Sequence, residues 1–371
     1  MKKSIGLTAL VLGLVAVAGS VIARGAANAD IRLPLTYQQG RADSYTCPSP
    51  APQGSSGKIV TVPGTTEFYG TVNCTGPTTA QAYLYHGRPP GQPIVTRLRL
   101  AEGANGAHAF GVAANGEVVG YMRFGSVLRP YRWVAGGEAI ALDSPSAGYA
   151  TAVGRTGLPI VGNAVDKLKV TQAAWFAPAP GFFIPPARAS GVFAVIASST
   201  PAGGIRYLYA GDLGGYAADG VAPGPLTQLP VGHPSTALAI NVEGYIAGRE
   251  LLSGKCGPYD HFSGFLIPFA DGKAAPVPPL PGDCASSAED LNDGNAVVGY
   301  SLHPKPAVQR AEGFNLTDYP RGLVDLNTTQ RYGAPPWAQK GHRLIAATGT
   351  DDRGDIAATD SAGTVWFLHI P

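Results

Sequence analysis

One short phrase recurs along the chain and constrains the fold more than any other feature. It consists of a short apolar strand, a turn with Asn or Asp before Gly, a β-branched run and a small residue. Five copies are present, at residues 109–120, 150–162, 237–248, 288–299 and 345–358. A tight hairpin needs turn residues that tolerate positive φ, as Gly, Asn and Asp do. Each copy therefore predicts two antiparallel strands joined by a tight turn.

Each copy is followed by a second apolar burst rich in aromatic residues, such as Tyr131-Arg132-Trp133-Val134. In the first four copies a shorter apolar segment comes next, as in Ala139-Ile140-Ala141-Leu142. We name the four expected strands A, B, C and D in chain order. Two degenerate units fit in the gaps, at residues 58–103 and 189–232, and the B strands then end at intervals of 37 to 59 residues.

Four-stranded units that repeat at this interval are typical of a β-propeller, in which each blade covers the apolar face of its neighbour. The sequence therefore predicts an all-β propeller of about seven blades. The last unit ends at its C strand, so we expect N-terminal residues such as Ile31 to Tyr37 to supply the missing D strand and close the ring. A linear β-solenoid and a pair of β-sandwiches are the competing architectures.

The phrase with Ala, Ile or Val, Asn, Gly and Val-Val-Gly, followed by an aromatic burst, resembles the HAF repeat family of secreted bacterial proteins. The resemblance covers residues 104–371 except 189–232. The chain departs from the family at the C strand, which often has His-Ala-Phe-Leu-Trp, because here His108-Ala109-Phe110 lies in an A strand. The family has no common activity, so the resemblance implies an extracellular repeat protein and assigns no functional residue.

Composition agrees with a fold of short strands. The 371 residues include 50 Gly and 33 Pro, which makes long helices an unlikely basis for the fold. The chain is also 45% hydrophobic and only 14% charged, which leaves ample apolar surface to bury and disfavours disorder.

The N-terminus has the pattern of a secretory signal peptide. Lys2 and Lys3 precede an apolar run at residues 7–22, and Ala27-Asn28-Ala29 supplies the small residues that cleavage requires. We expect residues 1–29 to be removed. An uncleaved anchor is the alternative, although the run is shorter than the ~20 residues of a comfortable membrane span.

Removal of the signal would leave residues 30–57 as an N-terminal segment with the ring-closing strand and residues 58–371 as the propeller. The mature chain would carry 24 basic and 25 acidic residues. A nearly neutral chain has no bulk field that attracts nucleic acid or an anionic membrane. We therefore expect no nucleic-acid partner and no membrane anchor after cleavage, and an extracellular or periplasmic location.

An exported chain with an even number of cysteines usually forms disulfides. The near pairs, Cys47 with Cys74 and Cys256 with Cys284, are the favoured pairing. A zinc site is the alternative, but no CxxC or CxxH spacing occurs.

Sorting the loops by blade geometry indicates where a ligand would bind. The A–B and C–D turns of an up-and-down blade share one end of the ring, and the B–C and D–A connections share the other. Two long insertions, at residues 251–262 and 327–341, fall at the second end, together with three of the four cysteines. Variable loops on a rigid scaffold commonly carry binding. The candidate ligand-binding residues are Tyr259, His261, Arg331, Tyr332 and Trp337, and the alternative is a set of braced loops without a ligand.

The sequence contains no G-x-S-x-G elbow and no phosphate-binding loop, and its seven His residues are scattered. The segment Asp290-Leu291-Asn292-Asp293-Gly294-Asn295 resembles part of a calcium loop but lacks the later bidentate carboxylate, and hairpin chemistry explains it without a metal. We therefore assign no catalytic residue, no metal and no cofactor.

These features predict a secreted binding or scaffold module whose partner is an extracellular carbohydrate or protein, since aromatic faces beside Arg suit sugars or peptides. A hydrolase or lyase that acts on polysaccharide and a purely structural envelope protein are the alternatives. Carboxylates clustered in the central channel would favour the enzyme, and a pocket lined by the candidate aromatic residues would favour recognition. The sequence does not determine the oligomeric state.

Overall fold

The computed structural model divides the chain into two compact units, Met1–Asp30 and Ile31–Pro371. The described residues all belong to the second unit and run from 42 to 369, with gaps at 49–52, 77–79, 89–91, 135, 145–146, 178–180, 183–191, 200–204, 212–215, 221–226, 230, 232–233, 269–272, 316–322 and 329–335. The predicted signal segment therefore lies outside the described residues. No helix among the described residues has the length and apolar character needed to cross a membrane.

In the described part of the chain, 28 strands form seven blades of four antiparallel strands each. Blade 1 contains β2 (Gln53–Thr61), β3 (Phe68–Thr75), β4 (Ala80–Gly87) and β5 (Ile94–Arg97). Blade 2 contains β6 (Gly106–Val112), β7 (Val118–Phe124), β8 (Val127–Trp133) and β9 (Ala139–Ala141). Blade 3 contains β10 (Gly148–Val153), β11 (Ile160–Val165), β12 (Thr171–Ala177) and β13 (Gly181–Phe182).

The second half of the ring continues the same order. Blade 4 contains β14 (Val192–Ser199), β15 (Ile205–Gly211), β16 (Tyr216–Gly220) and β17 (Thr227–Gln228). Blade 5 contains β18 (Ser235–Ile240), β19 (Tyr245–Cys256), β20 (Tyr259–Pro268) and β21 (Ala275–Val277). Blade 6 contains β22 (Ala285–Leu291), β23 (Ala296–Pro304), β24 (Ala307–Asn315) and β25 (Val324–Asp325), and blade 7 contains β26 (Leu344–Thr350), β27 (Ile356–Asp360), β28 (Val365–Leu368) and β1 (Ala42–Tyr45). A short helix, α1 (Pro336–Gln339), precedes β26.

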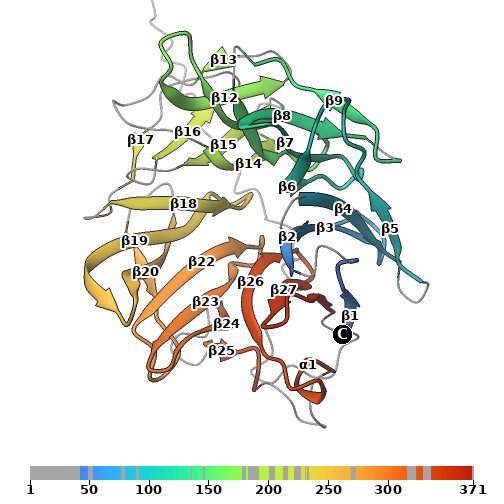
Figure 1. Cartoon of the computed structure of the whole chain (residues 1–371). Coiled ribbons are helices and arrows are strands. Elements are labelled where there is room, and N and C mark those ends of the chain that lie inside the picture. The colour runs from blue at the N-terminus through green and yellow to red at the C-terminus, as the bar shows by residue number, and fades with distance from the viewer. Residues whose placement is uncertain are drawn as a thin grey trace, which may run out of the picture. The chain divides into compact units, whose positions relative to one another are not determined.

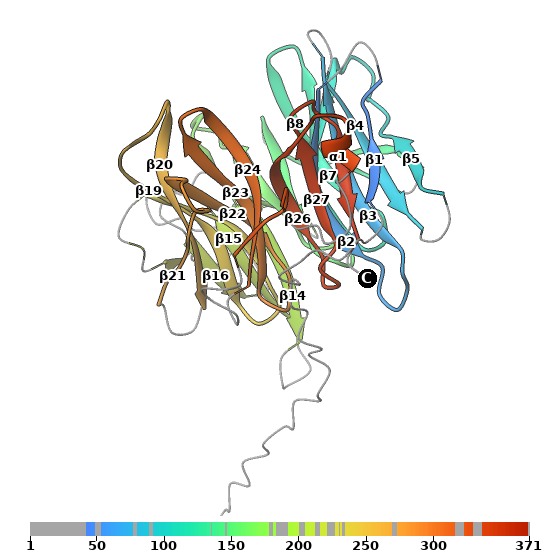
Figure 2. The ribbon, with the colours of Figure 1, turned by 90° about the horizontal axis from the view of Figure 1, so that it is seen from below.

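The A strands β2, β6, β14, β18, β22 and β26 lie around the centre of the ring in Figure 1. Because the chain direction alternates within each blade, the A–B and C–D turns share one end of the ring, here named the A–B end. The B–C and D–A connections share the other, here named the B–C end. In the side view of Figure 2 the β19–β20 and β23–β24 hairpins rise at this B–C end.

The ring is closed by a strand from the N-terminal segment, as predicted, but the residues differ from those expected. β1 pairs antiparallel with β28, from Ala42 opposite Leu368 to Tyr45 opposite Val365, and supplies the fourth strand of blade 7. The expected segment, Ile31 to Tyr37, lies outside the described residues. The Cys47–Cys74 disulfide accounts for this difference, because it fixes the chain on blade 1 immediately after β1.

Both favoured cysteine pairs form disulfides. Cys47 bonds Cys74 and Cys256 bonds Cys284, each with a Cα–Cα distance of 5.6 Å. The first joins the ring-closing strand to β3 of blade 1, and the second joins the tip of the β19–β20 hairpin to the start of blade 6. The thiols that a zinc site would require are therefore consumed.

A bulge in the A strand explains why the repeated phrase ends on a small residue. In blade 6 the pairing of β22 with β23 shifts between Ala288, opposite Gly299, and Asp290, opposite Val298. A corresponding shift occurs in β6, β10, β18 and β26. A Cβ atom on Gly299 would lie only 1.8 Å from the carbonyl oxygen of Ser287, so the bulged backbone occupies the space of a side chain.

The A–B turns share one hydrogen-bond pattern but differ in the residue with positive φ. The amide of Gly244 donates to the carbonyl of Asn241, and that of Gly354 donates to Asp351. In blade 6 the equivalent residue is Asn295, with a φ of 61°, rather than the Gly294 that the phrase suggests. Asn tolerates this left-handed region better than most residues, so Asn295 can occupy the turn position that Gly244 and Gly354 occupy in blades 5 and 7.

The apolar core consists of clusters between neighbouring blades, as expected for a propeller. Phe68 and Tyr85 of blade 1 pack on Phe367 of blade 7. Further clusters join blades 1 and 2, blades 2 and 3, blades 5 and 6, and blades 6 and 7. Each blade thus covers the face that its neighbour would otherwise expose.

Candidate functional site

Two of the predicted ligand-binding residues lie on a protruding hairpin of blade 5. The segment 251–262 is not a loop, because β19 and β20 remain paired as far as Cys256 opposite Tyr259. Tyr259 is 37% exposed near the tip. The imidazole Nδ1 of His261 lies 3.0 Å from the carbonyl oxygen of Ser253. The hairpin presents both side chains at the B–C end, but as two positions on a ribbon rather than as the lining of a pocket.

The other predicted residues do not join them. Trp337, in α1, is only 2% exposed and packs against Trp366 with a ring-centroid distance of 5.6 Å. It belongs to the cluster between blades 6 and 7, so its role is structural and its expected place on the ligand surface is corrected. Arg331 and Tyr332 lie outside the described residues, so their part of the prediction is not tested.

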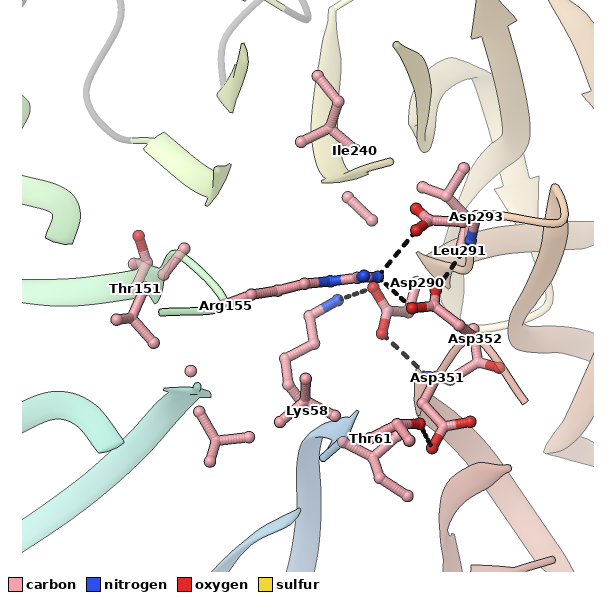
Figure 3. Close-up of a pocket in the computed structure, with 18 residues that line it drawn as sticks. Lys58, Thr61, Thr151, Arg155, Ile240, Asp290, Leu291, Asp293, Asp351 and Asp352 are labelled. Atoms are coloured by element: carbon pink, nitrogen blue, oxygen red, sulfur yellow. Dashed lines mark hydrogen bonds and ion pairs between the residues drawn. The ribbon is translucent and has the colours of Figure 1, made fainter. Parts of the chain in front are cut away.

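A cavity of about 120 Å³ lies between the A strands at the opposite, A–B end of the ring (Figure 3). The sequence did not indicate it, because its lining comes from six blades. The polar residues in this lining are Lys58, Thr61, Thr151, Arg155, Asp290, Asp293, Thr350, Asp351 and Asp352.

Two ion-pair bridges cross this part of the ring. Lys58 of blade 1 places its Nζ 2.6 Å from Asp290 Oδ1 of blade 6. Arg155 of blade 3 extends across the cavity, with its Nη2 3.0 Å from Asp293 Oδ2 of blade 6, and also pairs with Asp352 of blade 7 (Figure 3). The bridges connect blades that are not neighbours in the ring.

The carboxylates at this end are largely withdrawn from water. Burial raises the pKa of Asp290, against the opposing effect of Lys58. Burial and then the charge of Asp352 raise the pKa of Asp293. Burial and then the charge of Asp355 raise the pKa of Asp351 to about 6.

Each of these carboxylates is already engaged within the protein. Asp290 also accepts a hydrogen bond from the amide of Thr350 at 3.0 Å, and Asp351 accepts one from the hydroxyl of Thr61. Asn292 donates to the carbonyl oxygen of Asp351 in the next blade at 3.1 Å. The segment that resembles a calcium loop therefore links blade 6 to blade 7. The polar residues that line the cavity hold the blades together near the axis.

A group of four aromatic side chains lies on the inner strands of blades 2 and 3, from the middle of β6 and β7 to the first residues of β10. It consists of His108, Phe110, Tyr121 and Tyr149, which are all half-buried. His108 stacks on Tyr121 at 5.6 Å between ring centroids, and Phe110 contacts both Tyr121 at 5.9 Å and Tyr149 at 5.6 Å. We call these residues the aromatic group.

The aromatic group has a neutral imidazole and a neighbouring cation. Burial lowers the pKa of His108 to about 4, so the ring is uncharged at physiological pH. Arg123 is exposed and lies two residues after Tyr121 on the same face of β7. Aromatic faces beside Arg are the combination that the sequence analysis associates with sugar or peptide binding, and here they occur on blades 2 and 3.

A signal for this group was present in the sequence. His108 and Phe110 stand in an A strand where blades 5 and 6 have Thr236, Leu238, Ser287 and Glu289. The segment His108-Ala109-Phe110, noted in the sequence analysis, falls at this point. Sequence alone did not show that Tyr149, one blade further on, completes the group.

The fold places the chain among β-propeller proteins. Among solved structures, the acylaminoacyl peptidase of Pyrococcus horikoshii is similar with a TM-score of 0.51 and 6% identity, over 87% of this chain and 53% of that one. The chain thus spans about half the length of that peptidase. The β-propeller domain of the Trilobed protease from Pyrococcus furiosus gives a TM-score of 0.49 at 8% identity, over 83% and 91% of the two chains.

YCF48 bound to D1 peptide gives a TM-score of 0.47 at 10% identity, over 90% of this chain and 96% of that one. Identities this low show a shared fold and transfer no activity. No protein-family model matches the chain, and the comparison with curated proteins finds no match.

Proposed function

We propose that the chain is an exported propeller module that binds carbohydrate at the B–C end of the ring. The aromatic group carries this proposal, because it gathers four half-buried rings on the inner strands of two neighbouring blades. Sugar rings stack their C–H faces on aromatic side chains, and Tyr adds a polar handle. Arg123 would add directed hydrogen bonds to hydroxyl or carboxylate groups.

Three further observations support an exported module. Both disulfides are typical of an oxidising compartment rather than the cytosol. The repeated phrase and its aromatic burst support membership of the HAF repeat family, and the N-terminal pattern supports a cleaved signal. An extracellular or periplasmic site of action is part of this proposal.

A hydrolase that acts on polysaccharide is a second candidate, favoured by the carboxylates near the axis. Asp290 and Asp351 both have raised pKa values, as a general acid requires. Their engagement with Lys58 and Thr61 and the small cavity weigh against it, because a saccharide would have to displace Arg155 from Asp293 and Asp352. Recognition at the B–C end is therefore the better supported function.

A glycan array probed with the exported protein tests the proposal. We expect binding to at least one glycan, and a loss of about tenfold or more in Phe110→Ala and Tyr149→Ala, because a centrally placed aromatic contact is worth about 2 kcal/mol. The matched control is Tyr69→Ala, which removes another half-buried ring, stacked on His86 at 4.3 Å at the A–B end. Tyr259→Ala and His261→Ala test the positions predicted on the hairpin.

Binding to no glycan, or equal losses in Tyr69→Ala and Tyr149→Ala, would count against a carbohydrate site on the aromatic group. Release of reducing sugar from the bound glycan, abolished in Asp290→Asn, would instead assign the hydrolase.

A further inference from the structure

Two sets of hairpin connections at opposite ends of the ring differ in charge. The B–C connections of blades 2, 3, 5 and 6 comprise residues 123–129, 165–171, 251–262 and 303–308, and we call them the B–C tips. They hold six Lys or Arg and two Asp or Glu. The A–B turns at residues 62–67, 113–117, 154–159, 241–245, 292–296 and 351–355 hold two Lys or Arg and seven Asp or Glu. Basic and acidic residues are thus separated between these two sets of connections, although the chain as a whole is nearly neutral.

The B–C tips also carry most of the exposed large apolar side chains. Among the described residues seven such side chains are strongly exposed, and five of these lie on the tips: Val127, Leu168, Val170, Leu251 and Tyr259. Leu168 is 81% exposed. Single exposed apolar residues are ordinary, but five gathered at one end of a ring are a feature that needs a cause.

The tip of blade 3 shows how charge and apolar surface combine. Lys167 and Lys169 flank Leu168, all three are exposed, and neither lysine has an ion-pair partner within the described part of the chain. Asp166 forms no ion pair with either lysine in the described part of the chain, and its Oδ1 accepts hydrogen bonds from the amides of Leu168 at 2.8 Å and Val170 at 2.9 Å. The turn thus holds Leu168 outward between two free cations.

The tips of blades 2 and 5 also combine exposed apolar side chains with cations. Val127 is 41% exposed between Arg123 and Arg129. The guanidinium of Arg129 lies 5.3 Å from the ring centroid of Phe124. On blade 5, Tyr259 lies close to Lys255, whose charge Asp260 partly neutralises. An exposed apolar residue thus lies between two cations on the tips of blades 2 and 3, and near one ion-paired lysine on the tip of blade 5.

We propose that the B–C end docks on an anionic lipid surface. Lys and Arg at the tips would lie among the headgroups while Leu168, Val127 and Tyr259 enter the boundary with the acyl chains. The acidic A–B turns would face away from the surface, because like charges repel. This surface does not depend on the carbohydrate site, but it would present the aromatic group to sugars carried by the same membrane.

Vesicle co-sedimentation of the exported protein tests the docking. The probes are vesicles of phosphatidylcholine alone and of phosphatidylcholine mixed equally with phosphatidylglycerol, and mass spectrometry first checks the loss of residues 1–29. We expect binding to the mixed vesicles only, weakened by high salt. Lys167→Glu with Lys169→Glu should lower the partition coefficient at least tenfold, since each basic residue near an anionic surface contributes about a fivefold factor.

Leu168→Asp should also weaken binding about tenfold or more. The matched control is Leu158→Asp, because Leu158 is 39% exposed on the A–B turn of the same blade. Thermal unfolding of every variant separates loss of binding from loss of the fold.

Equal sedimentation with neutral and anionic vesicles, or equal losses in Leu158→Asp and Leu168→Asp, would overturn the proposal. Salt-sensitive retention on a soluble acidic polysaccharide without vesicle binding would overturn it too, and would assign the basic tips to that polymer. Vesicle binding that survives Tyr149→Ala would support the docking even where the carbohydrate site fails.

Discussion

Glu312 shows how a single buried residue couples the stability of the fold to pH. It lies on β24 opposite Gly299 and Asp325, and it is 1% exposed. Burial raises the pKa of this carboxyl well above its ordinary value, and the nearby carboxylates of Asp283 and Asp325 add to the effect. The folded chain therefore retains a proton at Glu312 that the unfolded chain releases once the pH exceeds about 4.5.

We predict that Glu312→Gln makes the protein more stable at alkaline pH. Because the folded state binds the extra proton, the contribution of Glu312 to the free energy of unfolding falls as the pH rises above the unfolded pKa. A neutral amide removes that loss, so the free energy of unfolding of Glu312→Gln should increasingly exceed that of the wild type as the pH rises above about 4.5. Denaturant unfolding across the pH range measures it, with the exposed Glu102→Gln as control. Parallel stability curves for wild type and Glu312→Gln would contradict the prediction.

At the scale of the element, the bulged A–B hairpin is the unit that repeats around the ring. The bulge directs the carbonyl of the A strand toward the B strand, where only a small residue fits. Blade 7 has Ala358 at this position, and its A strand carries a second register shift, between Leu344 and Ala346. The hairpin can therefore adapt to one methyl group only with a change in the backbone of its partner strand.

We predict that Gly299→Ala destabilises the protein by about 1 to 3 kcal/mol, the usual cost of overpacking. Its Cβ would meet the backbone oxygen of Ser287, which cannot move without shifting β22. The control is Ala358→Gly, for which we expect a cost of about 1 kcal/mol or less. The midpoint of thermal unfolding reports both. A Gly299→Ala variant with the melting temperature of the wild type would show that β22 yields freely.

Elements could be predicted from the sequence where local patterns determine them. The repeated phrase predicted the A–B hairpins, and the cysteine spacing predicted both disulfides. The extension of β19 and β20 was missed, because the register shift between Leu251 and Lys255 interrupts the alternation that marks a strand. The pairing of Arg155 with Asp293 could not be foreseen, because it joins residues 138 positions apart across the ring. The aromatic group was missed for the same reason, since it needs two blades in contact.

At the scale of the whole molecule, three features converge where the two ends of the described chain meet. β1 pairs with β28, and the Cys47–Cys74 disulfide ties the following residues to blade 1. His369, immediately after β28, lies between two carboxylates: its Nε2 is 3.5 Å from Asp43 of β1 and its Nδ1 is 3.4 Å from Asp355. A charged imidazole would thus bind the ring-closing strand to the blade that it completes.

Closure of the ring should therefore weaken at alkaline pH. Burial disfavours the charged imidazole of His369, but Asp355 and Asp43 outweigh it and raise its pKa from 6.5 to about 9. A base with a raised folded-state pKa stabilises fully below pH 6.5, and this stability is lost as the pH rises through about 9. The contribution is on the order of 3 kcal/mol. We predict that His369→Gln lowers the free energy of unfolding by this amount at pH 6 and by nearly nothing at pH 10, as measured by denaturant unfolding. These two pH values lie on either side of the window from about 6.5 to 9. His303→Gln, at the tip of blade 6, is the matched control. A constant difference between His369→Gln and the wild type would show that the imidazole acts through packing on Phe68, with a ring-centroid distance of 5.0 Å, and not through its charge.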